Sequence, residues 1–97
     1  MISVEITEKS IVTNGHASTL ICNTVSVLTW ALAMSLTKAR AKELIVKEDD
    51  GYMEIRFAPT KETAPIFNGI VVCFKAMGKQ FPDEIKIFIK NEKFLKG

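Results

Sequence analysis

The chain has 97 residues, 47% of them hydrophobic and 25% charged, which is typical of a single globular domain and excludes a disordered chain. Its net charge of +2 is too small to indicate direct nucleic-acid binding. Two cysteines, Cys22 and Cys73, are too few for a disulfide framework, and the N-terminus does not resemble a secretory signal. We therefore expect one domain over residues 1–97, in the cytoplasm and with reduced thiols.

The expected elements begin with two strands. Apolar and polar residues alternate over residues 2–7, which predicts a half-buried strand, and residues 11–13 begin a returning strand. Asn14 and Gly15 end this second strand, because both residue types tolerate positive φ.

Residues 17–36 carry no charge, and this length matches a membrane span. The segment contains hydroxyl and amide side chains, however, and its strongly apolar part, residues 25–36, is too short to cross a bilayer. Cations follow directly at Lys38, Arg40 and Lys42, as they would after a signal anchor. We expect a buried helix and no membrane association, and solubility without detergent separates the two possibilities.

The periodicity within this segment supports a helix. Apolar residues recur at helical spacing, at Val25, Leu28, Leu32 and Leu36. Much of the remaining circumference is also apolar, through Val27, Trp30, Ala31 and Met34. We expect this helix to be covered on more than one side, by a sheet and by a second helix or subunit.

The second half of the chain is expected to contain two further strands, a second helix and a closing strand. Residues 44–46 predict a third strand, Asp50-Gly51 a primed two-residue hairpin turn, and residues 53–57 a fourth strand. A second helix is expected from an N-cap at Thr63 to Pro82, with its buried stripe at Ile66, Ile70, Cys73 or Phe74, Met77 and Phe81. Residues 85–89 predict a fifth strand, and the basic tail from residue 91 is expected to be loose.

The resulting order is β-β-α-β-β-α-β. Hairpins combined with helices predict a mixed sheet with two helices packed over one face. The expected fold class is therefore α+β, a two-layer sandwich.

The candidate chemistry lies at the first strand-to-helix connection. His16, the sole histidine, follows the second strand, and Cys22 lies in the expected opening turn of the helix. Unpaired backbone N–H groups and the helix dipole favour a thiolate there. The short connection, residues 17–21, can return the imidazole to the sulfur to take its proton. The helix start also offers N–H groups to a developing oxyanion.

A purely structural interpretation competes with this one. His16 can cap a turn while Cys22 is a small core residue, because free cysteines are commonly buried. Cys73, which lies between Val72 and Phe74 on an apolar helix, is expected in the core. One histidine and two distant cysteines do not form a metal site, so neither a metal nor a cofactor is expected.

Two short motifs carry a family resemblance. NGHA at residues 14–17, followed by CNTVSVL at residues 22–28, resembles the Gly-His-Ala … Cys-x-x-Val-Ser-x-Leu signature of the ribosomal-processing cysteine protease family (Prp, YsxB-like). The likeness continues through Gly51-Tyr52 at the head of a strand, Gln80-Phe81-Pro82 at a helix end and a closing strand at residues 85–87. It covers nearly the whole chain.

The resemblance implies a cytoplasmic endopeptidase with a Cys–His dyad. Cys22 would be the nucleophile and His16 the base, with Gly15, Ala17 and Ser26 binding substrate or supporting the site. The substrate would be the N-terminal extension of a large-subunit ribosomal protein or a phage capsid or scaffold protein, and the enzyme would be a homodimer.

The chain departs from the family pattern between the two dyad residues. Many members have a longer, Gly-rich loop there with an acidic residue, whereas residues 17–21 contain neither glycine nor carboxylate. No acid from this loop can orient His16. The alternative function is therefore a catalytically weak relative that binds or assembles ribosomal or capsid proteins.

Overall fold

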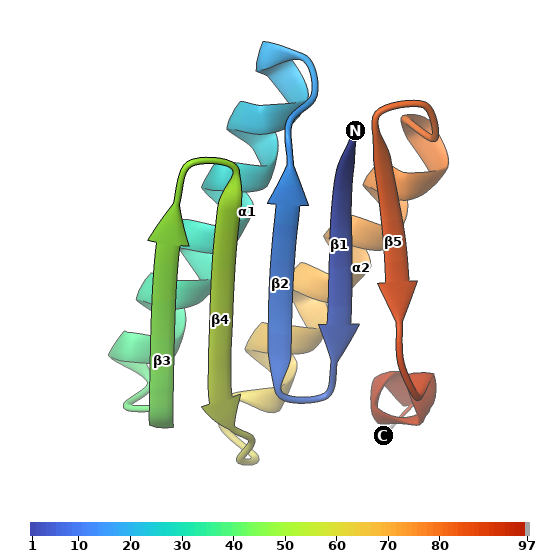
Figure 1. Ribbon diagram of the computed structural model, residues 1–97. Coiled ribbons are helices and arrows are strands. Elements are labelled where there is room, and N and C mark those ends of the chain that lie inside the picture. The colour runs from blue at the N-terminus through green and yellow to red at the C-terminus, as the bar shows by residue number, and fades with distance from the viewer. Residues whose placement is uncertain (97) are drawn as a thin grey trace.

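Five strands and two long helices follow one another in the order predicted from the sequence. The computed structural model describes residues 1–96 (Figure 1), and its elements are β1 (Ile2–Thr7), β2 (Ser10–Gly15), α1 (Thr19–Lys38), β3 (Lys42–Asp49), β4 (Tyr52–Ala58), α2 (Ala64–Gln80), β5 (Ile85–Ile89) and a short 3-10 helix, η1 (Glu92–Lys96).

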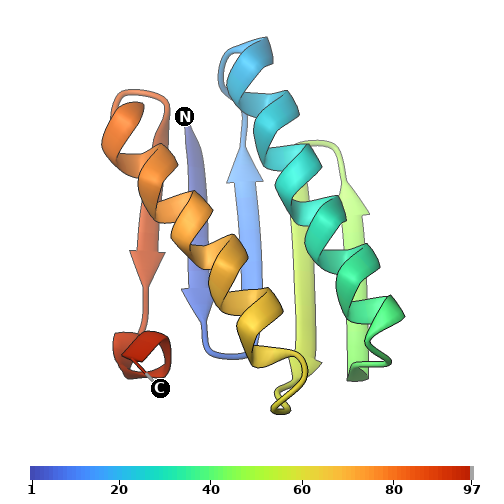
Figure 2. The same ribbon diagram turned by 180° about the vertical axis from the view of Figure 1, so that it is seen from behind.

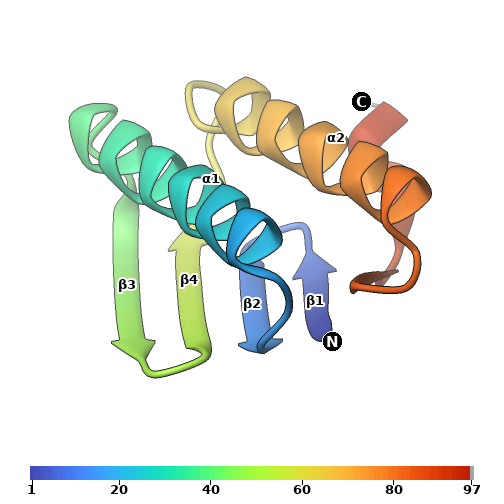
Figure 3. The ribbon, with the colours of Figure 1, turned by 90° about the horizontal axis from the view of Figure 1, so that it is seen from above.

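The strands form one mixed sheet in the order β3-β4-β2-β1-β5. β1 and β5 are parallel, whereas β1 with β2, β2 with β4, and β3 with β4 are antiparallel. Both helices cross the same face of the sheet (Figure 2), and the view from above shows the two layers directly (Figure 3). The predicted α+β sandwich is confirmed.

The core fills the space between the sheet and the helices. Alternate strand residues point toward the helices, as Ile2, Val4 and Ile6 do in β1. The inward face of α1 is buried through Ile21, Val25, Thr29, Leu32, Ala33 and Leu36. Burial of these apolar side chains is the main stabilising contribution to the fold.

The helix α1 packs against both the sheet and α2, as expected, but its outward face carries exposed apolar side chains. Leu20, Val27 and Met34 recur every seven residues and are each about two-thirds exposed, so in the single chain this helix is not covered on all its apolar sides. By length and composition alone, Thr19–Lys38 is apolar enough to span a membrane. Its opposite face packs against the sheet (Figure 3), as expected for a core helix.

The buried stripe of α2 agrees with the predicted one at Phe74 and Met77 and differs at its other positions. Its buried residues are Phe67, Val71, Phe74 and Met77. Cys73 is exposed, so its predicted place in the core is wrong. A helix with apolar residues at adjacent positions can face the sheet in more than one rotation, and here the two large phenylalanine rings point inward.

Residues 91–96 are ordered against the domain, which corrects the prediction of a loose tail. The η1 helix places the Phe94 ring 6.1 Å from the Phe67 ring, centroid to centroid. The Asn68 side-chain amide donates a hydrogen bond of 3.5 Å to the Phe94 carbonyl. The last residue of the predicted tail, Gly97, lies outside the described residues.

Candidate active site

Three segments meet at one end of the sheet and form a cavity. They are the end of β2, the first half of α1 and the β3–β4 hairpin, all at the top of Figure 1. The cavity has a volume of about 210 Å³, and His16 and Cys22 both line it. The two predicted dyad residues therefore share one compartment.

Cys22 lies in the first turn of α1, as predicted. Ser18 caps this helix, and its hydroxyl accepts a hydrogen bond from the Ile21 N–H. The Cys22 sulfur is half-buried and touches the backbone of Ala17, at 3.3 Å from its nitrogen and 3.4 Å from its oxygen. The thiol can donate to that oxygen, and a thiolate can accept from that N–H, so both protonation states have a partner.

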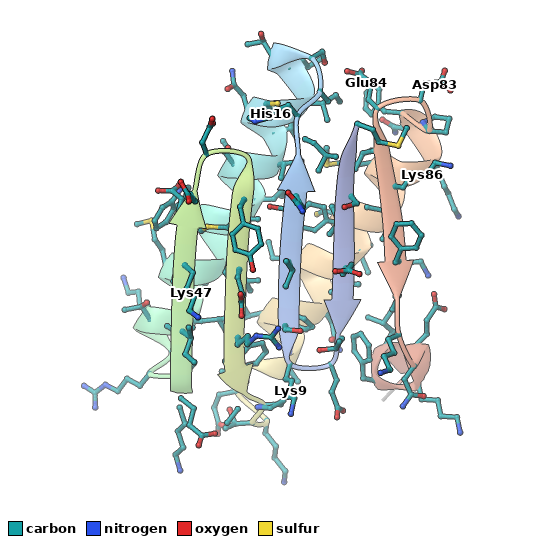
Figure 4. All side chains as sticks on the ribbon, in the orientation of Figure 1. Lys9, His16, Lys47, Asp83, Glu84 and Lys86 are labelled. Carbon is teal, nitrogen blue, oxygen red and sulfur yellow. The ribbon has the colours of Figure 1, made fainter. Side chains whose placement is uncertain are left out.

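His16 projects from the end of β2 at the top of the sheet (Figure 4). Its Nε2 atom lies 3.8 Å from Oδ1 of Asp50. Over residues 1–96, no hydrogen bond joins the imidazole to the Cys22 thiol, which is instead engaged with Ala17. The structure thus places the two groups on one cavity while each has a different nearest polar partner.

The β3–β4 hairpin turn supports the imidazole. A side-chain carbon on Gly51 would lie 2.5 Å from the His16 Nε2 atom, so any other residue there would displace the ring from this position. Gly51 has φ of +67°, whereas Asp50 does not have a positive φ. The predicted primed turn is therefore wrong, because type I′ and II′ turns both need positive φ at their first central residue.

The same turn is fixed to the backbone beside His16. The Gly15 N–H donates a hydrogen bond of 2.8 Å to the Gly51 carbonyl. Gly15 has φ of +109°, and a side-chain carbon there would lie 2.3 Å from the Met1 carbonyl oxygen. The structure thus gives Gly15 a packing reason to be glycine.

The other predicted supporting residues lie beside the sulfur or on the cavity wall. Ala17 contacts the Cys22 sulfur through its backbone. Ser26 lines the cavity one helical turn after Cys22. Whether these residues contact a substrate stays a prediction.

Sequence reasoning missed the contacts of two carboxylates in this region. Asp50 faces His16 from the hairpin. Glu84 accepts a hydrogen bond of 2.9 Å from the Ser18 N–H, and hydrogen bonding from the Ser18 side chain, followed by this backbone bond, holds the pKa of Glu84 below its ordinary value. The sequence signal for Asp50 was its place in a hairpin turn, but no local pattern connects Glu84 with Ser18.

A polar network lies next to the cavity on the helix-free face of the sheet. The Tyr52 hydroxyl donates a 2.6 Å hydrogen bond to Glu54, and Arg56 donates to the other oxygen of this carboxylate. Hydrogen bonds from Tyr52 and then Arg56 lower the pKa of Glu54, while the same contact with Glu54 raises the pKa of Tyr52. The Tyr52 hydroxyl is therefore held in its neutral, donating form.

Comparison with known proteins supports the fold. No family model matches the sequence, and no curated protein matches it. Among solved structures, the S. aureus ribosomal processing protease Prp with a covalently linked product peptide has a TM-score of 0.81 and 21% identity, over 93% of this chain and 100% of that one. Prp in complex with a substrate peptide has a TM-score of 0.82 and 17% identity, again over 93% of this chain and 100% of that one.

A further similar structure is SMU.848 from Streptococcus mutans, with a TM-score of 0.77 and 22% identity over 92% of this chain and 96% of that one. At these identities the likeness establishes the fold. The resemblance to the Prp family is thus confirmed at the level of architecture across nearly the whole chain.

Proposed function

We propose that this chain is a cysteine endopeptidase in which Cys22 is the nucleophile and His16 the general base. The observation that carries the proposal is that both side chains line one cavity at the start of α1. A fold with TM-scores of 0.81 and 0.82 to a ribosomal processing protease supports it. The proposed substrate is the N-terminal extension of a ribosomal protein, with phage capsid or scaffold proteins as further candidates.

The surroundings of the sulfur favour this chemistry. The Ala17 N–H points at the Cys22 sulfur from 3.3 Å, and a backbone N–H stabilises a thiolate more than a thiol. The sulfur also lies in the first turn of α1, where the helix dipole favours negative charge. Both effects act on the nucleophile without an acidic neighbour on the helix, since the first turn of α1 contains no acidic residue.

The proposed reaction has two halves. His16 takes the proton from the Cys22 thiol, and the sulfur attacks the peptide carbonyl to form a tetrahedral intermediate. The imidazolium returns the proton to the departing amine, which leaves an acyl-enzyme. His16 then deprotonates water, which releases the acid product and regenerates the thiol.

The cavity lies between two walls. One wall is α1, with Ser26 and Trp30, and the other is the β3–β4 hairpin, with Tyr52. The Trp30 ring nitrogen donates a 3.2 Å hydrogen bond to Glu48, which joins the two walls.

The test is incubation with a panel of ribosomal-protein and capsid-protein extension peptides, read by mass spectrometry. We expect wild-type protein to cleave at least one peptide and Cys22→Ala to lose at least about 10³-fold of this activity. The matched control is Cys73→Ala, which removes the other thiol at an exposed position and leaves cleavage unchanged. A wild-type protein that binds such a peptide without cutting it would support the binding-protein alternative and contradict the proposal.

A further inference from the structure

We propose that Asp50 is the positioning residue for His16, supplying from the β3–β4 hairpin the carboxylate that the loop between His16 and Cys22 lacks. This inference rests on the proposed function, because it assigns a role within the same site. Residues 17–21 contain no acidic side chain. The Asp50 Oδ1 atom lies 3.8 Å from the His16 Nε2 atom.

The hairpin holds the Asp50 backbone at a fixed place relative to the histidine backbone. Gly51, next to Asp50, accepts the hydrogen bond from the Gly15 N–H, and Gly15 precedes His16. The His16 ring also lies directly over Gly51, where no side chain intervenes. Asp50 and His16 are therefore carried by two backbone segments that are bonded to each other.

The chemistry assigns each ring nitrogen a different task. The 3.8 Å separation is longer than a hydrogen bond, so the two exposed side chains must close together before Asp50 accepts from the Nε2–H; that bond then fixes the neutral tautomer with its lone pair on Nδ1. Nδ1 can then take the proton from the Cys22 sulfur, and the resulting imidazolium faces the Asp50 charge. The same proton leaves Nδ1 for the departing amine, so Asp50 itself gains no proton during the cycle.

The neighbouring acids have other partners. The Asp49 carboxylate accepts a 2.7 Å hydrogen bond from the Asp50 N–H, and Glu48 accepts from the Trp30 ring. The remaining ionisable side chains on the cavity are Cys22 and Tyr52, and the Tyr52 hydroxyl points to Glu54. Of these groups, Asp50 is the one in ion-pair distance of the imidazole.

Exposure to solvent determines how strongly the Asp50 carboxylate attracts the His16 imidazole. The side chains of His16 and Asp50 are 64% and 94% exposed, so water and salt weaken their attraction in the free protein. A bound peptide excludes water from the cavity and strengthens the contact. We therefore expect Asp50 to act more on turnover than on substrate binding.

The test compares Asp50→Asn with Asp50→Glu and Glu8→Gln. Asparagine is isosteric and common in turns, so Asp50→Asn removes the charge and keeps the hairpin. Asp50→Glu keeps a carboxylate at this position. Glu8→Gln removes one negative charge beside Lys9, at the opposite end of the sheet from His16 (Figure 4), and so controls for net charge.

The first readout needs no substrate. At pH 6, iodoacetamide should alkylate Cys22 about threefold to tenfold more slowly in Asp50→Asn than in wild type, relative to Cys73 in the same molecule. Asp50→Glu should recover part of this rate, and Glu8→Gln should match wild type. Equal rates in wild type and Asp50→Asn would overturn the inference.

The second readout is cleavage of a peptide that wild type cuts. We expect kcat to fall about tenfold in Asp50→Asn with KM within twofold of wild type. A change confined to KM would make Asp50 a substrate contact and overturn the positioning role. If wild type cuts no peptide, the proposed function fails, and the alkylation result still decides separately whether Asp50 acts on His16.

Discussion

The hydrogen bond between Glu84 and Ser18 joins residues 66 positions apart, and it fixes the loop that precedes α1. Glu84 stands just before β5 and Ser18 caps α1, so this contact connects the far edge of the sheet to the candidate site (Figure 4). The pKa of Glu84 is lowered by its hydrogen bond to Ser18, with a smaller contribution from the nearby N-terminal amine. This carboxylate is therefore more easily ionised in the folded chain than in the unfolded one.

Lowering the pH should remove the stability that the ionised Glu84 carboxylate contributes through its contact with Ser18. Because the folded pKa lies below the ordinary value of 4.5, the contribution is complete above that value and is lost as the pH falls through the folded pKa. We expect Glu84→Gln to lower Tm more at pH 7 than at pH 2.5. The matched control is the neighbouring Asp83→Asn, whose side chain makes no hydrogen bond within residues 1–96. An equal loss of Tm for Glu84→Gln at both pH values would contradict the account.

At the scale of elements, the strands and the buried face of α1 could be read from the sequence, whereas the rotation of α2 could not. Alternation fixes which strand residues face inward, and the Ile2, Val4 and Ile6 pattern of β1 is buried as expected. In α2, apolar side chains occupy adjacent positions such as Val72, Cys73 and Phe74. Their inward direction depends on the shape of the sheet beneath them, which no local pattern encodes.

The rotation of α2 predicts that truncating two adjacent side chains, Phe74 and Cys73, will have unequal effects on stability. Phe74 is fully buried and Cys73 is exposed. We expect Phe74→Ala to reduce the free energy of unfolding by about 3 to 5 kcal/mol, since it leaves a cavity in the core. Cys73→Ala should change it by less than about 0.5 kcal/mol. Urea denaturation followed by circular dichroism measures both, and a larger loss for Cys73→Ala would mean that α2 faces the sheet in a different rotation.

At the scale of the whole molecule, the candidate site combines local and distant parts. His16 and Cys22 are six positions apart across one strand-to-helix connection, so the sequence could place them together. Asp50 arrives through the pairing of β2 with β4, and single-sequence patterns do not reveal which strands pair. The expected homodimer stays a prediction, and the exposed Leu20, Val27 and Met34 on α1 are available for such a contact.

The relative alkylation of the two thiols at pH 6 tests most directly whether the imidazole activates the sulfur. Cys73 is the more exposed thiol and provides an internal reference in every molecule. We predict that iodoacetamide labels Cys22 at least about tenfold faster than Cys73, and that His16→Ala removes this advantage. If Cys22 reacts no faster than Cys73, with or without His16, the two side chains do not act together, and the account of this chain as a cysteine protease is contradicted.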